Sequence, residues 1–291
     1  MKFLKNTMSG NSSFIAYLNG EFLPLENAFL HVSDLAIQRG YGIFDFFKVQ
    51  QGQPLFLPDY LNRFYASAML MGLPVPVSEE ELTSIIQALL QKNGQTEAGI
   101  KMILTGGYSE NGYDPATPNF LITQHALTLP SEAQIATGIK VITHEYVREL
   151  AAAKTINYIV GIKLIQQVRA QNADDVLYHQ AGVVSEFPRS NIFMVTEENT
   201  LVTPELNVLQ GITRKNVLEL AQGHYKTEVR PITLQELATA KEAFMTSTTK
   251  RLLPIVQVDN QIIGIGKPGT VTLSLLKKLV GLEEKYIASA K

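Results

Sequence analysis

The sequence predicts a two-domain protein of α/β (mixed α+β) class. Strand patterns and helix patterns follow one another along the 291 residues without the regular strand–helix–strand rhythm of a parallel sheet. An irregular stretch with a proline, HALTLPSEAQIATG, separates two well-patterned halves. We therefore expect a loose tail at residues 1–16, a small N-terminal domain at 17–125, a linker at 126–138 and a larger C-terminal domain at 139–291.

The N-terminal half is expected to combine hairpins with two helices. In IAYLNGEFLP, Asn19-Gly20 lies between alternating apolar residues and predicts a hairpin, and a second hairpin is expected around Gln51-Gly52. The stretch LPDYLNRFYASAMLMGL predicts a helix whose apolar face holds Leu61, Phe64, Ala68 and Met71. Ser78 opens a capping box for the next helix, and strands are expected at IKMILT and NFLITQ.

The C-terminal half is expected to be richer in strands. Strand or hairpin patterns occur in IKVITHEYV, DDVLYHQAGVVSEF, SNIFMVTEENTLVTP, YKTEVRPI and EAFMT. Helical patterns occur in NYIVGIKLIQQVRAQN, TRKNVLELAQG, TLQELATA and GTVTLSLLKKLVGL. In the first of these helices we expect the following residues to face inward: Ile159, Ile162, Ile165 and Val168.

The composition excludes several classes of protein. The formal net charge is −2, so no basic excess indicates binding to nucleic acid. Cysteine is absent, which rules out disulfides, thiolate catalysis and zinc sites built on cysteine. The sequence shows neither an apolar core of signal-peptide length nor a run of roughly 18 apolar residues that could cross a membrane. We therefore expect a cytoplasmic protein without membrane contact.

Several familiar signals for chemistry do not apply. GIGKPG fits the pattern G-x-G-x-x-G but lies near the C-terminus without a following strand, so it predicts a turn before the last helix. The five histidines form no metal-binding spacing, so no metal site is expected. The serines show no nucleophile-elbow pattern, which leaves no positive signal for a hydrolase.

The stretch AAAKTINY directs attention to Lys154. A lysine that attacks a carbonyl needs a lowered pKa, and the alanines before it offer little solvation. Taken alone, Lys154 also fits a solvated lysine at the end of a strand, which is the more common situation.

Other segments supply what such a lysine would need. Glu186 lies in a turn after a hairpin strand, and the glycine turn before Ile212 and Thr213 directs backbone amides toward an anion. FMTSTTK ends a strand in a row of hydroxyl residues, 246–249, and Arg63 lies among apolar residues where its guanidinium needs an anionic partner. An amine, a carboxylate and a phosphate cradle are the three requirements of pyridoxal phosphate.

The order of these motifs resembles that of the class IV, or fold type IV, pyridoxal-phosphate aminotransferases. The motifs are K-x-x-N-Y, VSE with SNIF, LQGITR, FMTST, LPIVQVD and IGIG with GTVT, preceded by YLNGEFLPLENAFLHVSDLAIQRGYGIFDFFKV and LPDYLNRFYASA. The family includes branched-chain aminotransferase, D-amino acid aminotransferase and aminodeoxychorismate lyase. The resemblance extends over nearly the whole chain from about Tyr17, and it implies the two-domain D-amino acid aminotransferase-like fold.

The resemblance also implies roles for individual residues. Lys154, expected in the larger domain, is similar to the catalytic lysine that binds the cofactor covalently, and Glu186 to the acid that pairs with the pyridinium nitrogen. Tyr158 matches a tyrosine beside the ring, and Asn191 is expected to hold the turn of Glu186. The positions that match phosphate-binding residues are Arg63, Ile212, Thr213, Thr248 and the neighbouring Thr249.

The implied reaction is a two-step, ping-pong transamination between an amino acid and a 2-oxo acid. The substrate would be a branched-chain L-amino acid or a D-amino acid. The alternative is a lyase that eliminates pyruvate on the same cofactor cradle; a cofactor-binding protein without activity conflicts with the intact lysine and acid. The family also implies a homodimer with its active site at the subunit interface.

The substrate side departs from the family pattern. The loop TGGYSENGYDPATPNF lacks the arginine and histidine of the D-amino acid enzymes and has Asn111 and Tyr113 instead. We expect Arg39 and Lys101 to attract a substrate carboxylate, with Phe44 and Tyr41 as wall residues of the pocket. Alternatively, Arg39 ends a helix and Lys101 is a solvated strand residue.

Overall fold

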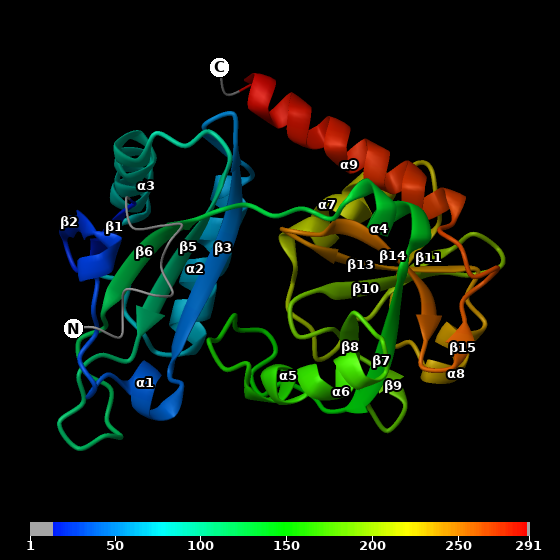
Figure 1. The fold of residues 1–291 in the computed structure, drawn as a ribbon, viewed down its shortest axis with the longest axis horizontal. Coiled ribbons are helices and arrows are strands. Elements are labelled where there is room, and N and C mark those ends of the chain that lie inside the picture. The colour runs from blue at the N-terminus through cyan, green and yellow to red at the C-terminus, as the bar shows by residue number, and fades with distance from the viewer. Residues whose placement is uncertain (1–13, 290–291) are drawn as a thin grey trace. The chain divides into compact units, whose positions relative to one another are not determined.

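The computed structural model describes residues 14–289, which divide into two compact units (Figure 1). The first unit contains residues 14–127 together with Ala153–Asn157, and the second contains Thr128–Ala152 and Tyr158–Ser289. Most of the expected N-terminal tail, residues 1–13, lies outside the described residues, and Ile15 already begins the first strand.

The described part of the first unit forms a six-stranded antiparallel sheet in the order β2-β1-β6-β5-β3-β4. Its strands are β1 (Ile15–Leu18), β2 (Glu21–Pro24), β3 (Gly42–Gln50), β4 (Gln53–Pro54), β5 (Ala98–Thr105) and β6 (Phe120–His125). Its helices are η1 (Leu25–Asn27), α1 (Leu35–Arg39), α2 (Leu57–Leu70) and α3 (Glu79–Asn93). Both predicted hairpins are confirmed, because Asn19, Gly20, Gln51 and Gly52 all adopt the positive φ that tight turns require.

Helix α2 packs against β3 with the predicted apolar face (Figure 1). All four residues of that face are buried, namely Leu61, Phe64, Ala68 and Met71. Helix α3 begins as expected, since the hydroxyl of Ser78 accepts a hydrogen bond from the amide of Glu81 at 3.2 Å.

The second unit forms a nine-stranded mixed sheet in the order β12-β11-β10-β13-β14-β7-β8-β9, with β15 paired to β14. Its strands are β7 (Ile139–Glu145), β8 (Asp175–Gln180), β9 (Val183–Val184), β10 (Asn191–Val195), β11 (Leu201–Thr203), β12 (Thr227–Val229), β13 (Glu242–Ser247), β14 (Arg251–Val258) and β15 (Gln261–Ile262). Its helices are α4 (Glu132–Thr137), α5 (Ile159–Lys163), α6 (Ile165–Ala170), α7 (Ile212–Ala221), α8 (Leu234–Ala238) and α9 (Thr270–Ser289).

The central strands of this sheet are buried on both faces. One face packs Ile192, Met245 and Ile255 into one apolar cluster, while the other packs Phe193 and Phe244 beneath α7 and α9. Figure 1 shows α9 lying along the sheet. Burial of both faces explains why EAFMT and SNIF read as nearly continuous apolar runs.

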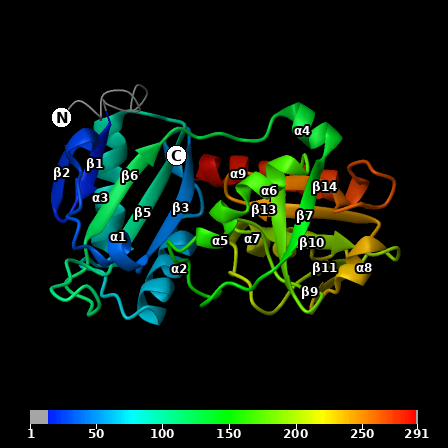
Figure 2. The same cartoon turned by 60° about the horizontal axis from the view of Figure 1, so that its bottom comes forward.

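The orientation predicted for the helix at NYIVGIKLIQQVRAQN is wrong for its three isoleucines and right for Val168, which is buried. The helix is broken at Leu164 into α5 and α6, which are seen one after the other in Figure 2, and α6 packs against β8. Ile159, Ile162 and Ile165 are 68%, 65% and 41% exposed. The inward stripe runs instead through residues four apart, namely Val160, Leu164 and Val168. The three-residue spacing of the isoleucines therefore marked the outer face.

The stretch expected to be an irregular linker contains helix α4. Ser131 and Gln134 form a capping box in which each side chain binds the backbone of the other residue. The signal was present in the sequence as S-x-x-Q, but the preceding proline and the polar composition favoured a loop.

The segment around Lys154 groups with the first unit, although it was expected in the larger C-terminal domain. Phe44 donates its amide to the carbonyl of Lys154 at 2.9 Å, and Ile156 donates to the carbonyl of Gly42 at 3.0 Å. Residues 153–157 therefore pair with the beginning of β3. The limits of the two domains remain a prediction.

The string GIGKPG forms the predicted turn before the last helix. Its backbone is tightly bent, with positive φ at Gly264 and Gly266. The carboxylate of Glu242 caps α9 by accepting the amides of Val271 at 3.0 Å and Thr272 at 2.8 Å. A protein carboxylate therefore occupies the helix end where a nucleotide phosphate would bind.

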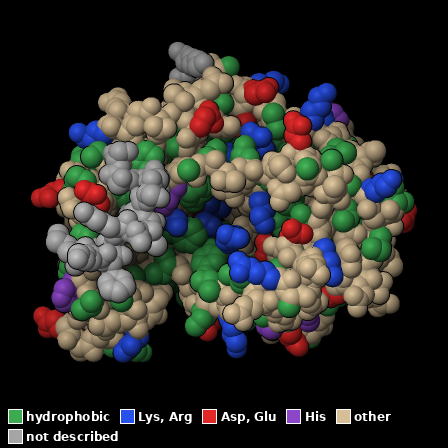
Figure 3. All heavy atoms as spheres, in the orientation of Figure 1, with side chains coloured by type: hydrophobic (Ala, Val, Ile, Leu, Met, Phe, Trp, Pro, Cys, Tyr) green, Lys and Arg blue, Asp and Glu red, His purple; other side chains and the backbone are tan. Residues whose placement is uncertain are grey.

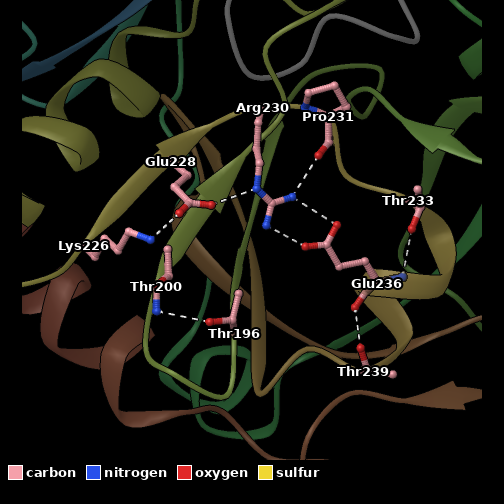
Figure 4. A network of polar contacts seen from close by, with 9 residues as sticks. All are labelled: Thr196, Thr200, Lys226, Glu228, Arg230, Pro231, Thr233, Glu236 and Thr239. Carbon is pink, nitrogen blue, oxygen red and sulfur yellow. Dashed lines mark hydrogen bonds and ion pairs between the residues drawn. The ribbon is translucent and has the colours of Figure 1, made fainter.

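The surface carries charges of both signs. In Figure 3, acidic and basic side chains are interspersed over the second unit, in keeping with a net charge of −2. One network joins β12 to α8: Arg230 binds Glu228 at 2.8 Å and Glu236 at 2.6 Å, and Lys226 binds Glu228 (Figure 4). Among residues 14–289, no helix is long and apolar enough to span a membrane.

Candidate active site

The side chain of Lys154 lies over an aromatic ring. Its Nζ is 4.7 Å from the centroid of Phe44, and its backbone amide donates to the hydroxyl of Ser67 at 3.1 Å. Lys154 is half-buried and Ala153 is buried, whereas Ala152 is exposed. Of these two alanines, only Ala153, next to the lysine, is shielded from solvent. The Phe44 ring shields the Lys154 amine as well.

A second amine approaches the same ring. Lys101 on β5 has its Nζ 5.6 Å from the centroid of Phe44. Burial lowers the pKa of Lys101, and the pKa of nearby His125 is lowered by its own burial and by the charge of Lys101. The structure therefore brings together three of the predicted residues: Lys154, Phe44 and Lys101.

Arg63 projects from α2 onto β3, where it binds a carboxylate that the sequence did not reveal. Its Nε and Nη2 donate to Oδ2 and Oδ1 of Asp45 at 2.9 and 2.7 Å, and Asp45 is fully buried. The guanidinium also lies 5.2 Å from the ring of Tyr60. Arg63 therefore has an anionic partner within the protein, the carboxylate of Asp45. The signal was a lone acid within the apolar strand IFDFF.

Arg39 stands at the end of α1. It is the exposed last residue of α1, and its Nη1 donates to the carbonyl of Gln38 at 3.0 Å. None of its interactions within the described residues involves Phe44, Lys101 or Lys154. In the neighbouring loop, Asn111 accepts the amides of Tyr113 and Asp114, both at 2.9 Å, and thereby orders the loop itself.

In the second unit, Glu186 is a buried carboxylate whose two oxygens both accept hydrogen bonds. Its Oε1 accepts from Nε of Arg148 at 2.7 Å, and its Oε2 accepts from the amide of Leu209 at 2.9 Å. Asn191 donates to Oε2 at 3.4 Å and to the carbonyl of Leu209 at 2.8 Å, which supports its expected role in holding this turn. The sequence did not reveal Arg148, because nothing local connects it with residue 186.

The start of α7 presents backbone hydrogen-bond donors. Gly211 is the N-cap residue, and no described side chain caps this helix end. The amides of Ile212 and Thr213 belong to its first turn, where backbone donors have no partner inside the helix. A Cβ on Gly211 would lie 2.1 Å from Oδ1 of Asn191, so only glycine fits here.

The fit at Gly211 gives a testable prediction. Gly211→Ala should push Asn191 away from Leu209 and Glu186, and we expect a loss of about 1–3 kcal/mol in the free energy of unfolding, measured with urea. Gly281→Ala is the matched control, since nothing lies within 4 Å of a Cβ at that position in α9. The control should be neutral or slightly stabilising; equal effects of both substitutions would contradict the prediction.

The row of hydroxyl residues lies at the end of β13. Thr246 is buried, and its Oγ1 has no partner among the described residues. Thr248 and Thr249 are half-buried in the turn that follows. Tyr158, also half-buried, is the N-cap residue of α5, where Gly161 allows Tyr178 and Pro188 to pack closely.

Comparison with known proteins identifies the family of the chain. Residues 42–258 match the family described as amino-transferase class IV. The chain belongs to this family. The class IV aminotransferase assignment confirms the resemblance noted in the sequence, and the chain is therefore an enzyme that transfers an amino group.

Individual relatives of this aminotransferase carry two kinds of name. A Methanocaldococcus jannaschii protein, provisionally named branched-chain-amino-acid aminotransferase, is 29% identical over 93% of this chain and 96% of its own length. The D-alanine aminotransferase of Bacillus licheniformis is 28% identical over 87% of this chain and 92% of its own length. Both names describe aminotransferases, so the lyase alternative is not favoured.

Solved structures confirm the fold. A branched-chain amino acid aminotransferase from T.th., solved with pyridoxamine 5'-phosphate, has a TM-score of 0.86 and 26% identity, and the match covers 92% of this chain and 93% of that one. The predicted mixed α/β fold of type IV is thereby confirmed.

Proposed function

We propose that this enzyme transfers the amino group of branched-chain L-amino acids to a 2-oxo acid by a ping-pong mechanism. The observation that carries the proposal is the Lys154 amine lying on the Phe44 ring, with the Lys101 cation on the same ring. D-amino acids are the second candidate substrates, because relatives named D-alanine aminotransferases are about as similar as the branched-chain relative.

We infer that the cofactor is pyridoxal 5'-phosphate, whose ring accepts electrons from the substrate Cα when it is bound. The residues present fit such a group. Glu186 is a buried carboxylate held by Arg148, the start of α7 has amides without a side-chain cap, and Thr246 has a buried hydroxyl without a described partner.

Each candidate residue then has a defined task. Lys154 would hold the cofactor covalently, and its Nζ would move the proton at the substrate Cα. Glu186 would keep the ring nitrogen protonated, and Tyr158 would contact the ring. The phosphate would be held by Arg63, the amides of Ile212 and Thr213, and the hydroxyls of Thr248 and Thr249.

On the substrate side, Phe44 would form an apolar wall and Lys101 would attract a carboxylate. We also propose that Arg39 attracts the substrate carboxylate. This role would require its guanidinium to reach beyond the end of α1, where it binds the carbonyl of Gln38. We further propose a cytoplasmic homodimer in which the active site is completed at the subunit interface, as the family resemblance implies.

The reaction and its stereochemistry can be tested together. The purified enzyme is mixed with single L- or D-amino acids and the absorbance of its bound cofactor is followed. We expect the absorbance to bleach with L-leucine, L-isoleucine or L-valine alone and to recover after addition of a 2-oxo acid. If only D-amino acids bleach the absorbance, the substrates are D-amino acids and the proposal of branched-chain L-amino acids is wrong. Release of pyruvate from a single substrate without recovery would contradict transamination.

Lys101 allows a prediction that separates substrate binding from stability. Lys101→Met should raise KM for amino acids about 10–100-fold, because a charge-assisted contact to the substrate carboxylate is lost. The same variant should unfold at a higher temperature near pH 7. Burial lowers the folded-state pKa of Lys101, so its charged form costs stability below that pKa. The cost fades as the pH rises from the folded-state value toward the unfolded value near 10.5, and it is absent above that value.

The control for this variant is Lys92→Met. Lys92 also lies over an aromatic ring, that of Phe22, but it is exposed on α3. It should leave KM unchanged. An unchanged KM in Lys101→Met would show that Lys101 does not bind the substrate carboxylate.

A further inference from the structure

Two consecutive basic residues that the proposed reaction does not use stand where the turn between β13 and β14 ends and β14 begins. Thr248 and Thr249 are followed directly by Lys250 and Arg251. The two basic side chains leave this turn toward different elements, and each meets a buried carboxylate. The hydroxyl residues proposed to bind the phosphate therefore lie beside two ion pairs.

Lys250 ties the turn to β8. Its Nζ lies 2.9 Å from Oδ2 of Asp175, the buried first residue of that strand, and 3.2 Å from Sδ of Met245. Oδ1 of Asp175 accepts the amide of Val176 at 2.9 Å, so both oxygens of the carboxylate are engaged. The amide of Lys250 donates to the hydroxyl of Ser247 at 3.2 Å, which closes the turn at its base.

Arg251 ties the other side of the turn to α9. Its Nε and Nη2 lie 2.8 and 2.7 Å from Oε2 of Glu283, which is buried. Arg251 also has φ of +53°, in the left-handed region that residues with a Cβ rarely adopt. Such a conformation persists where surrounding contacts impose it, and here the ion pair with α9 is one such contact.

Two anchors on separate elements restrict the turn more than either would alone. β8 is two strands away from β14 in the sheet, whereas α9 packs on β13 and β14 themselves. Because each basic group is paired with a buried acid, the anchors need no ligand to form. We propose that Lys250 and Arg251 are positioning residues that fix Thr248 and Thr249 for the cofactor phosphate. The inference rests on the proposed function.

The test compares two ligands on the enzyme freed of cofactor: pyridoxal phosphate and pyridoxal, which lacks the phosphate. In Lys250→Met and in Arg251→Met we expect the Kd for pyridoxal phosphate to rise about 10–100-fold, as for the loss of one charge-assisted hydrogen bond. The Kd for pyridoxal should change less than about twofold. Lys250→Arg, which retains the charge, should bind pyridoxal phosphate nearly as the unchanged enzyme does.

The matched control is Arg230→Met, which removes a basic residue from the half-exposed network of β12 and α8 (Figure 4). It should leave both Kd values unchanged. If Lys250→Met does not fold, the double variant Lys250→Met with Asp175→Leu, which removes both charges of the ion pair, is measured instead. It should show the same rise in the Kd for pyridoxal phosphate and little change in the Kd for pyridoxal.

The outcomes separate the inference from the proposed function. If the unchanged enzyme fails to bind pyridoxal phosphate, the proposed function is wrong. If it binds and the folded variants keep the same Kd, only the positioning role is wrong. Equal weakening of pyridoxal and pyridoxal phosphate would likewise overturn it, because a general distortion would not distinguish the two ligands.

Discussion

Lys154→Ala is expected to reduce turnover at least about 10⁴-fold, because it removes both the covalent attachment and the group that moves the proton at Cα. The fold should survive. The backbone of residue 154 makes its hydrogen bonds to Ser67 and Phe44 without the side chain, and the lost contact with the Phe44 ring is worth about 0.5–2 kcal/mol.

The measurement needs a readout besides activity. Borohydride reduction of the enzyme with pyridoxal phosphate should add to residue 154 of the unchanged chain the mass of the cofactor less the water lost on joining the amine and plus two hydrogens from the reduction, and should add nothing to the variant at that residue. Lys163→Ala is the control, since Lys163 is exposed on α5. It should retain both the mass increase and the turnover. Turnover in Lys154→Ala within tenfold of the unchanged enzyme would return Lys154 to the role of an ordinary solvated lysine.

Local sequence signals predicted local structure well. The hairpins follow from Asn-Gly and Gln-Gly turns whose residues adopt positive φ, a requirement that a few neighbouring residues determine. The buried face of α2 follows from spacing within one helix. The same kind of spacing misled at α5, where three exposed isoleucines imitate an inward stripe. Spacing identifies an apolar face, but only packing decides which face is inward.

The contacts of the candidate site were the least predictable part. Asp45 and Arg63 are 18 residues apart, and Arg148 and Glu186 are 38 residues apart. Each pair forms because separate elements bring the two side chains together, and no periodicity in the sequence records that. The amine, carboxylate and guanidinium of Lys154, Glu186 and Arg63 indicated function from the sequence. The residues that bind these groups could be identified only from the three-dimensional structure.

The second large effect is expected for Glu186→Gln. The oxygens of Glu186 accept from Arg148 and from the amide of Leu209, so a glutamine must turn its own N–H donors toward at least one of these donors. Arg148 then loses its ion pair with the Glu186 carboxylate while its charge stays buried. We expect a loss of about 3–5 kcal/mol in the free energy of unfolding and a fall in turnover of about 10²–10³-fold.

A second substitution distinguishes the structural from the chemical role of this carboxylate. Adding Arg148→Met to Glu186→Gln removes the buried charge that has lost its Glu186 partner, so urea unfolding should show that most of the lost stability is recovered. Turnover should remain low, because the double variant still lacks an anion for the ring nitrogen. If turnover recovered together with stability, Glu186 would act only by holding Arg148 and the loop at Leu209. Recovery of stability alone is the result that a cofactor-binding carboxylate requires.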